Sequence, residues 1–536
     1  MKEKFYITTS IPYLNGAPHL GHALEFLQAD VIARYGRFLD KEVFFLSGAD
    51  EHGAKIARTA EAAGKAPKDF VDEQVKQFLD LLTKLGISND DFIRTSDEKK
   101  HWLGAQLLWS KLAAAGDIYK GFYKGFYCVG HEAFITEKDM KDSVCEIHKK
   151  PPEPIEEENY FFKLSKYTDK LREVIEKDQI KILPAFRKEE TLNMLKEIGD
   201  ISFSRPSKDI SWGVPVPNDA THTMYVWCDA LANYITALGY GQEGFATQDS
   251  QFTKYWPADV HVVGKDIMKF HSIFWPAMLM SAGLPLPKTI FVHGWINLKG
   301  EKMSKSVGNV VEPFALLEKY GKEAVRFYLA HEVPTFGDGD YSEAHFEETY
   351  DGFLVKGLGN LTARTLKMMS SFQLIQKPDE ASLARYPVRK NLEFLAGGKK
   401  DFSFEEATPV FLVDSLLWPK YKQAMANYDI SEAIKNIWIF LSRLDEYIEE
   451  YKVYKMITAQ PEDAKIALWH LAYSLASTAL MLKPFLPETA DKILGTLGVN
   501  NNSTETWTSF SAKEVPHLFP RIKEKKENES PLTKES

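Results

Sequence analysis

Short apolar runs and longer periodic stretches alternate along the first 115 residues of the chain. The runs at residues 4–9 and 43–47 are rich in aromatic and β-branched residues, which predicts buried strands. The stretches from 19 to about 38 and from about 54 repeat their apolar residues at helical spacing. This strand–helix–strand–helix order predicts a doubly wound parallel sheet, with ligands bound beyond the carboxyl ends of its strands.

The alternation stops after about residue 115 and returns later. Residues 116–222 are rich in aromatic residues, glycine, proline and paired cysteine and histidine, which predicts an inserted domain. Strand–helix alternation returns at 223–230, 260–264 and 290–292. From about residue 342 the pattern is almost entirely helical, and the strongly charged end from residue 521 predicts a disordered tail.

Composition narrows the class of protein. A chain of 536 residues is too long for one core, so several domains are expected. The net charge of −9 excludes a generally basic nucleic-acid-binding surface, so an RNA site would have to be local. Three cysteines predict a reducing, cytoplasmic environment. The most apolar run, residues 466–482, is short for a bilayer and contains His470, which predicts a buried bundle helix and no membrane partner.

Two polar motifs are candidates for one nucleotide site. His19 and His22 share a face at the start of the first predicted helix, where free amides favour anions, and Gly21 would let a base or ribose approach closely. Lys302 and Lys305 lie on a glycine-flanked loop and suit phosphate. Exposed histidines at a helix start and a solvated basic turn are the alternatives. No nucleophile or general base stands nearby, which favours catalysis by positioning and electrostatics.

Gly264 and Asp266 follow another predicted strand, at residues 260–263. A carboxylate after a strand of such a sheet suits a pair of ribose hydroxyls, and a simple helix cap is the alternative.

Two cysteine–histidine pairs in the predicted insertion indicate a metal site. Cys128 and His131 form one pair, and Cys145 and His148 form the other, with thirteen residues between the two pairs. Thiolate and imidazole at this spacing suit a structural, tetrahedral Zn²⁺. A metal would also supply folding energy to a small domain with little core. The alternative is a metal-free knuckle with two free thiols.

The order of these motifs resembles class I aminoacyl-tRNA synthetases, whose two signatures match His19-Leu20-Gly21-His22 and Lys302-Met303-Ser304-Lys305-Ser306. Further motifs narrow the resemblance to methionyl-tRNA synthetases: SIPYLNG at 10–16, GADEHG at 48–53, YVWCDA at 225–230 and the stretch 264–279. The insertion is too short to be an editing domain, which argues against the leucyl, isoleucyl and valyl relatives.

The resemblance implies methionine activation with ATP and Mg²⁺, followed by transfer of methionine to the 3′ end of tRNA. It assigns Asp50 to the substrate ammonium. Apolar and aromatic walls suit the thioether. Ile11 departs from an expected leucine, and Leu231 departs from an expected proline. The implied residues are, for catalysis, His19, His22, Lys302 and Lys305; for ATP, His19, Gly21, His22, Gly264, Asp266 and Lys305; and for methionine, Ile11, Tyr13, Asp50, Trp227, Ala230, Leu231, Tyr234 and His271.

In the helical half, the resemblance implies that Asn360 and Arg364 read the anticodon. Tyr454 takes the place of a tryptophan there, and Val453 that of a proline. A tyrosine can still stack on an unpaired base. The alternatives are a solvated helix face for the first two residues and a packed core tyrosine for Tyr454.

The family often carries a zinc knuckle in its insertion, with mostly cysteine ligands, so His131 is a departure.

The expected fold is thus a Rossmann-like α/β catalytic domain with a small zinc-knuckle insertion, followed by an α-helical anticodon-binding bundle. No appended oligonucleotide-binding barrel is recognised, so a monomer is expected. Two other functions stay open: a ligase that uses a non-RNA acceptor, and a non-catalytic RNA-binding paralogue. The expected boundaries are 1–115 and 223–288 for the catalytic halves, 116–222 for the insertion, 289–345 for the lysine loop and stem-contact region, 346–520 for the anticodon-binding domain and 521–536 for the tail.

Overall fold

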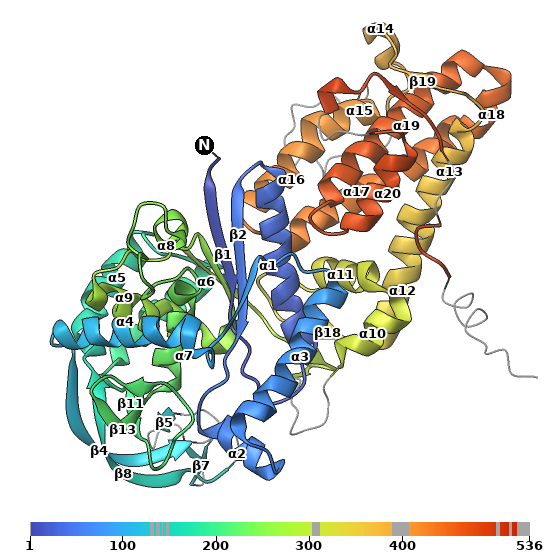
Figure 1. Cartoon of the computed structure of the whole chain (residues 1–536). Coiled ribbons are helices and arrows are strands. Elements are labelled where there is room, and N and C mark those ends of the chain that lie inside the picture. The colour runs from blue at the N-terminus through green and yellow to red at the C-terminus, as the bar shows by residue number, and fades with distance from the viewer. Residues whose placement is uncertain are drawn as a thin grey trace, which may run out of the picture. The chain divides into compact units, whose positions relative to one another are not determined.

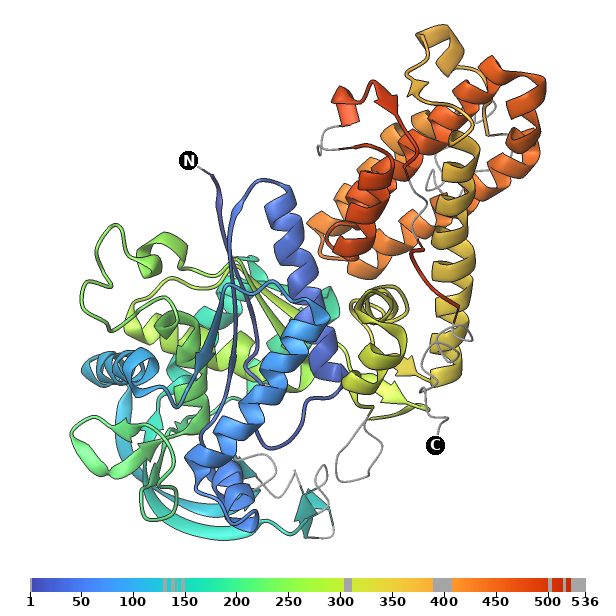
Figure 2. The same ribbon diagram turned by 45° about the vertical axis from the view of Figure 1, so that its right-hand side comes forward.

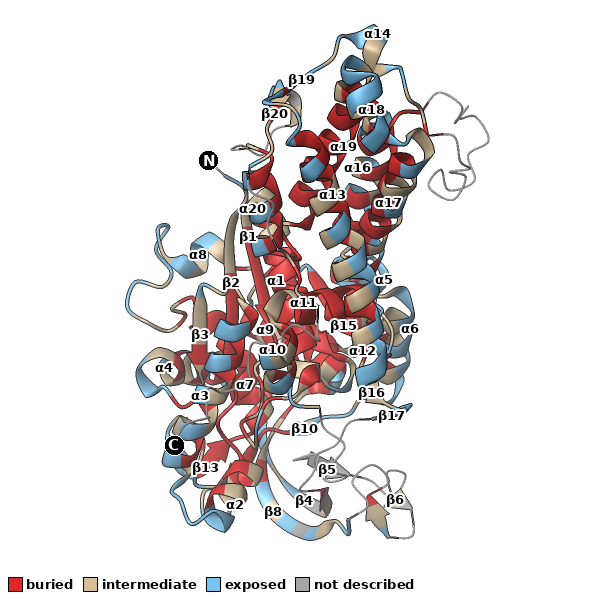
Figure 3. Ribbon diagram, turned by 90° about the vertical axis from the view of Figure 1, so that its right-hand side faces the viewer, coloured by how far each residue is buried: buried red, intermediate tan, exposed pale blue. Residues whose placement is uncertain are grey.

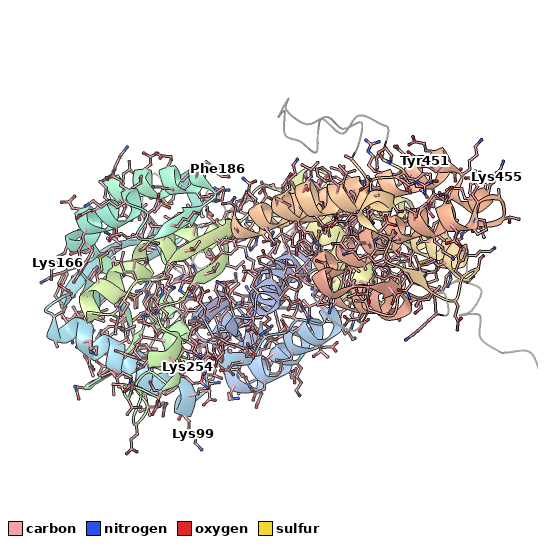
Figure 4. All side chains as sticks on the ribbon, turned by 90° about the horizontal axis from the view of Figure 1, so that it is seen from above. Lys99, Lys166, Phe186, Lys254, Tyr451 and Lys455 are labelled. Carbon is pink, nitrogen blue, oxygen red and sulfur yellow. The ribbon has the colours of Figure 1, made fainter. Side chains whose placement is uncertain are left out.

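The computed structural model describes residues 2–128, 133–135, 140–141, 143–145, 150–302, 311–388, 407–499, 504–513 and 517–521. The chain forms two compact units, residues 1–295 and 296–536 (Figure 1). Each unit has its own interior of buried residues, and its outer turns are exposed (Figure 3). Long polar side chains such as those of Lys99, Lys254 and Lys455 point away from the ribbon (Figure 4).

A six-stranded parallel sheet forms the centre of the first unit, which confirms the predicted fold class of the catalytic half. The chain adds strands on one side of β1 and then crosses to the other side before β14. The switch point between β1 and β14 is where such sheets bind ligands. The strand order is β3 (Asp91–Arg94), β2 (Glu42–Ala49), β1 (Lys4–Thr9), β14 (Val260–Gly264), β15 (Thr289–His293) and β9 (Lys181–Leu183).

Helices cover both faces of this sheet (Figure 1, Figure 2). Successive side chains along each strand point to opposite faces, so the strands pack on both layers of helices. Tyr6 belongs to the core that β14 and β15 share with α4 (Leu103–Ala114), α7 (Val226–Thr236) and α9 (Trp275–Ala282). On the other face α1 (Leu20–Phe38) packs on β1, β2 and β14, and α3 (Pro67–Leu85) packs on α1. The remaining helices of the unit are α2 (Ala54–Ala62), α5 (Thr168–Glu176), α6 (Ala185–Met194) and α8 (Gln251–Tyr255).

The described part of the segment between α4 and α7 builds two larger antiparallel sheets and the two-stranded antiparallel sheet β6-β7. The strand orders of the two larger sheets are β10-β8-β4-β5 and β11-β13-β12. The short strand β9 lies inside this segment but pairs with β15 of the main sheet, a role that its three residues did not signal in the sequence. The bounds are β4 (Ile118–Cys128), β5 (Ala133–Ile135), β6 (Met140–Lys141), β7 (Val144–Cys145), β8 (Glu153–Phe162), β10 (Ile201–Ser202), β11 (Ser204–Pro206), β12 (Pro215–Val216) and β13 (Asp219–Met224).

The second unit is mostly helical, as the pattern predicted. Residues 466–482 lie in α19 (Pro461–Leu482) and are buried, so this run is a bundle helix. In the described part of the chain, no helix combines the length and apolar character needed to span a bilayer. The other long helices are α10 (Pro313–Tyr320), α11 (Lys322–His331), α12 (Glu343–Thr349), the continuous pair η7 (Tyr350–Gly359) and α13 (Asn360–Met369), α16 (Trp418–Ala426), α17 (Ile430–Tyr451), α18 (Val453–Ala459) and α20 (Pro487–Thr496).

Short elements complete the second unit. A small sheet of order β17-β16-β18 opens it, and a two-stranded ladder joins β19 to β20. Their bounds are β16 (Ile296–Leu298), β17 (Glu301–Lys302), β18 (Gly339–Tyr341), β19 (Ile375–Gln376), β20 (Ser509–Phe510), α14 (Glu380–Leu383) and α15 (Pro409–Leu412).

Candidate active site

The loop after β1 is held against the end of β2. The backbone N–H of Asp50 donates to the Pro12 carbonyl at 2.9 Å, and the N–H of Leu14 donates to the Asp50 carbonyl at 3.1 Å. Tyr13 and Asp50 form a parallel bridge. This pairing places the Ile11–Tyr13 stretch and Asp50 side by side beyond the carboxyl edge of the sheet, as the predicted methionine site requires.

Two stacked imidazoles mark the N-terminus of α1. His19 is the N-cap residue, and its backbone N–H donates to Nδ1 of His22 at 3.1 Å. The two rings stack with their centroids 3.8 Å apart. Because Nδ1 of His22 accepts this bond, the proton of the neutral ring lies on Nε2, which remains able to donate. A Cβ at Gly21 would lie 3.0 Å from the His19 ring, so the bare glycine accommodates that imidazole here.

A buried Glu25 ties together three elements beneath this helix start. It accepts hydrogen bonds from the N–H and the hydroxyl of Ser10 at 2.9 and 2.5 Å. Its Oε2 also lies 3.0 Å from Nε2 of His293, at the end of β15. Burial alone would lower the pKa of His293, but the Glu25 carboxylate raises it above its usual value. Neither residue belongs to a motif that marked the site in the sequence, although an acidic residue within the buried face of a predicted helix is a visible signal.

Gly264 and Asp266 lie at the end of β14, on the other side of the switch point. Asp266 is exposed, in the turn that follows the strand. A Cβ at Gly264 would lie 2.9 Å from Oδ1 of Asp266 and 3.6 Å from the His293 ring, so a larger residue would crowd both.

The predicted aromatic walls of the methionine pocket come together in the structure. The Tyr234 hydroxyl lies 2.7 Å from Nε2 of His271, whose Nδ1 lies 2.9 Å from the Ile267 carbonyl. A carbonyl only accepts, so Nδ1 of His271 carries the proton and Nε2 accepts from Tyr234. Burial lowers the pKa of His271 to about 4, so this ring is neutral near pH 7. Trp227 stacks on Phe270 with centroids 3.7 Å apart and meets the His271 ring edge-on.

One helix supplies most of this wall. Trp227, Ala230, Leu231 and Tyr234 all lie on α7, at spacings that share one helix face. The last three are buried, and Trp227 is partly buried.

The residues after Asp50 are anchored in two directions. Glu51 is fully buried and accepts hydrogen bonds from Arg94 at 2.6 and 3.0 Å and from the Ser96 hydroxyl. His52 turns the other way, and its Nδ1 lies 2.6 Å from the Asp229 carboxylate of α7. The motif at 48–53 had marked this segment, but it did not reveal these partners.

Asp229 accepts from a second histidine. Nε2 of His101 lies 2.6 Å from Oδ1 of Asp229, and all three side chains of this triad are buried. Burial alone would raise the pKa of Asp229, but His52 and His101 lower it to about 2. The carboxylate is therefore ionised throughout the physiological range.

Of the two lysines in the predicted lysine motif, only Lys302 is among the described residues. Lys302 ends the described strand β17 in the second unit, and Lys305 lies outside the described residues. The predicted opposition of these lysines and the two histidines therefore stays a prediction.

Half of the predicted zinc site is described. Cys128 and Cys145 are both buried and belong to one small cluster with Phe126 and Met140 packed on it. His131 and His148 lie outside the described residues. Among the described residues, no group of three or more histidine, cysteine, aspartate or glutamate side chains is arranged so that it could hold a metal ion.

The predicted anticodon residues lie in the second unit. Arg364 on α13 pairs with Asp445 at 2.6 Å and with Glu449, both on α17. Asn360 is exposed on the same helix. Tyr454 on α18 is 44% exposed, which does not fit a packed core tyrosine.

Comparison with known proteins agrees with this geometry. Residues 5–140 and 135–366 match the family described as "tRNA synthetases class I (M)", and residues 417–532 match "Anticodon-binding domain of tRNA ligase". A methionine--tRNA ligase of Caldanaerobacter subterraneus is 40% identical over 98% of this chain and 80% of its own length. One of Thermotoga maritima is 39% identical over 91% of this chain and 74% of its own.

A solved structure is similar over almost the whole chain. The methionyl-tRNA synthetase of Mycobacterium tuberculosis in complex with methionyl-adenylate has a TM-score of 0.86 and 35% identity, covering 97% of this chain and 100% of its own. The family model covers well over half of this sequence, and the relatives align across most of it. The chain therefore belongs to the class I tRNA synthetases of the methionine--tRNA ligase family.

Proposed function

We propose that this chain joins methionine to tRNA, with methionyl-adenylate as the intermediate. One observation carries the proposal: beyond the carboxyl ends of β1 and β2 lie the paired imidazoles of α1 and Asp50, and α7 contacts the segments after β2 and β14 through His52 and His271. A carboxylate, an apolar pocket and an anion-binding helix start are the three features that an amino acid and a nucleotide need when they react there.

Methionine would bind between Asp50 and α7. The Asp50 carboxylate would hold the substrate ammonium, and Ile11 and Tyr13 follow on the adjacent loop. The neutral His271 and the ring of Trp227 would face the thioether, because sulfur makes favourable contacts with aromatic rings. Ala230, Leu231 and Tyr234 would complete the pocket.

ATP would bind across the switch point. His19 and His22 would donate to phosphate oxygens, Gly21 and Gly264 would border the nucleoside, and Asp266 would accept from the ribose hydroxyls. Lys302 and Lys305 would supply positive charge from the lysine loop. Mg²⁺ would enter with ATP and neutralise part of the phosphate charge.

The chemistry is an in-line displacement. A carboxylate oxygen of methionine bonds to the α-phosphorus while the bond to the bridging oxygen breaks and pyrophosphate leaves. His22 would stabilise the developing charge through Nε2–H. A terminal ribose hydroxyl of tRNA then attacks the carbonyl carbon of the adenylate, and AMP leaves.

The second unit would select the tRNA. Asn360, Arg364 and Tyr454 would contact the anticodon, with Tyr454 stacking on an unpaired base. The segment 116–222 would guide the acceptor end, 289–345 would contact the stem, and 346–520 would form the anticodon-binding domain. A monomer in the cytoplasm completes this proposal.

Zinc would hold the insertion together. Cys128 and Cys145 share one buried cluster. His131 follows Cys128, and His148 follows Cys145, each at metal-ligand spacing. Two thiolates and two imidazoles fit a structural Zn²⁺. Elemental analysis should find one zinc per chain, and Cys128→Ser should lose it; a purified protein without zinc would refute this site.

Charging of tRNA with labelled methionine tests the whole function. The purified chain should charge tRNA in the presence of ATP, and Lys305→Ala should lower the exchange of pyrophosphate into ATP by orders of magnitude while methionine affinity holds. Exchange without charging would instead identify a ligase with another acceptor. Binding of tRNA without exchange would identify a non-catalytic paralogue.

A further inference from the structure

The buried carboxylate of Asp229 is bonded to His52 and His101, and so joins three segments of the catalytic unit. None of these three residues is among the proposed substrate contacts. We propose that His52 and His101 are positioning residues for methionine: through Asp229 they fix the pocket wall of α7 relative to Asp50. The inference rests on the proposed function, because it assumes that this wall and Asp50 bind the two ends of one amino acid.

The geometry of the triad defines which atoms matter. Nδ1 of His52 lies 2.6 Å from Oδ2 of Asp229, and Nε2 of His101 lies 2.6 Å from Oδ1. An ionised carboxylate only accepts hydrogen bonds. Nδ1 of His52 and Nε2 of His101 therefore both carry protons. The two histidines thus bond Asp229 through different ring nitrogens.

His101 grips α7 at two places. Its Nε2 bonds Asp229 in the first turn of α7, and its Nδ1 lies 2.8 Å from the Thr236 hydroxyl at the last residue of the helix. These two residues are two turns apart, so they share one face of the helix. A ring bonded to both prevents α7 from rotating about its axis, and rotation would carry Trp227 and Tyr234 out of register.

His52 connects the same helix to the ammonium site. It follows Asp50 by two residues, so its bond to Asp229 ties the end of β2 to α7. Its ring lies edge-on to Trp102 and Trp212, with centroids 6.0 and 5.2 Å away. Nε2 has no hydrogen-bond partner in the described part of the chain, so Nδ1 is its polar anchor.

Crossed substitutions test this arrangement. An asparagine places its amide nitrogen about where histidine has Nδ1, and a glutamine places it about where histidine has Nε2. His52→Asn should therefore keep the bond to Asp229, whereas His52→Gln should lose it. At His101 the order should reverse, because the bond uses Nε2: His101→Gln should keep it and His101→Asn should lose it.

The readout is the KM for methionine and the KM for ATP in pyrophosphate exchange. The two variants that lose the bond should raise the methionine KM by about tenfold and leave the ATP KM within about twofold. The two variants that keep the bond to Asp229 should have KM values for methionine and ATP close to those of the unaltered chain. Thermal melting of all four variants accompanies the assay.

The proposal fails if the members of each pair behave alike, if the ATP KM rises with that of methionine, or if all four variants unfold. Each of these results would make the triad a support of the fold only. An unaltered chain that shows no methionine-dependent exchange would refute the proposed function itself, which separates the two failures.

Discussion

The Tyr234 hydroxyl donates to Nε2 of His271 across 2.7 Å of buried space. The Ile267 carbonyl accepts a hydrogen bond from Nδ1–H of His271, so the Tyr234 hydroxyl is the donor that satisfies the unprotonated Nε2. The pair fixes both the tautomer and the direction of a neutral imidazole in the proposed methionine pocket.

Replacing Tyr234 by phenylalanine removes that donor. A buried nitrogen left without a partner costs about 1–3 kcal/mol, so the His271 ring should lose its fixed direction. The methionine KM in pyrophosphate exchange should rise by about tenfold, with the ATP KM unchanged. Tyr6→Phe is the matched control, because the Tyr6 hydroxyl bonds the Tyr234 backbone carbonyl and lies outside the pocket wall. Equal effects of the two changes would refute the role of the Tyr234 hydroxyl.

Arg94→Met tests the anchor beside Asp50. It strips the fully buried Glu51 carboxylate of its cation, and breaking such a pair costs about 3–5 kcal/mol. Urea unfolding should show that the free energy of unfolding falls by this amount. Glu51→Gln combined with Arg94→Met should recover much of it, because no charge is then buried alone. A single variant as stable as the unaltered chain would show that Arg94 does not hold this segment.

The fold was largely predictable from the sequence because its signals are local. The strands at residues 4–9 and 260–264 and the helix from residue 20 each follow from their own composition and period. The candidate pocket followed from short motifs, and the structure brings Trp227, Tyr234 and His271 together.

Long-range polar pairs were not predictable in this way. His52 and Asp229 are 177 residues apart, and Glu25 and His293 are 268 residues apart. No local pattern specifies such partners, because the order of strands in the sheet brings them together. The strand β9 escaped prediction for a related reason: three residues carry too weak a signal, and only its pairing with β15 identifies it.

His470 should make the helical unit sensitive to acid. Burial lowers the pKa of His470 from 6.5 to about 4, and its Nε2 donates to the Arg385 carbonyl at 3.2 Å. In the unfolded chain this ring binds a proton below about pH 6.5, whereas the folded protein binds it only near pH 4. Protonation thus favours unfolding, and the free energy of unfolding should fall by about 3 kcal/mol across this interval.

His470→Gln removes the titration but keeps an amide donor near the position of Nε2. Urea unfolding at pH 7, 5.5 and 4.5 should therefore show that the free energy of unfolding depends less on pH in this variant than in the unaltered chain. His517→Gln, a change at an exposed histidine, should leave the dependence unaltered. If the free energy of unfolding fell equally with pH in His470→Gln and in the unaltered chain, this source of acid sensitivity would be refuted.

Tyr454→Ala should separate charging from activation. Loss of a stacked base costs about 1–3 kcal/mol, so kcat/KM for tRNA should fall by about tenfold or more while pyrophosphate exchange is unaffected. Leu79→Ala on α3 is the control, since Leu79 is also an exposed apolar residue, at 40%, but lies outside the segments proposed to contact tRNA. A parallel fall in exchange would show that Tyr454 supports the fold instead of contacting tRNA.

Amino-acid-dependent exchange of pyrophosphate into ATP tests the central claim most directly, because it needs neither tRNA nor the second unit's contacts with it. Methionine, leucine, isoleucine and cysteine should be compared at equal concentrations. The account predicts rapid exchange with methionine and far slower exchange with the other three. No exchange with methionine, or faster exchange with any of the others, would contradict it.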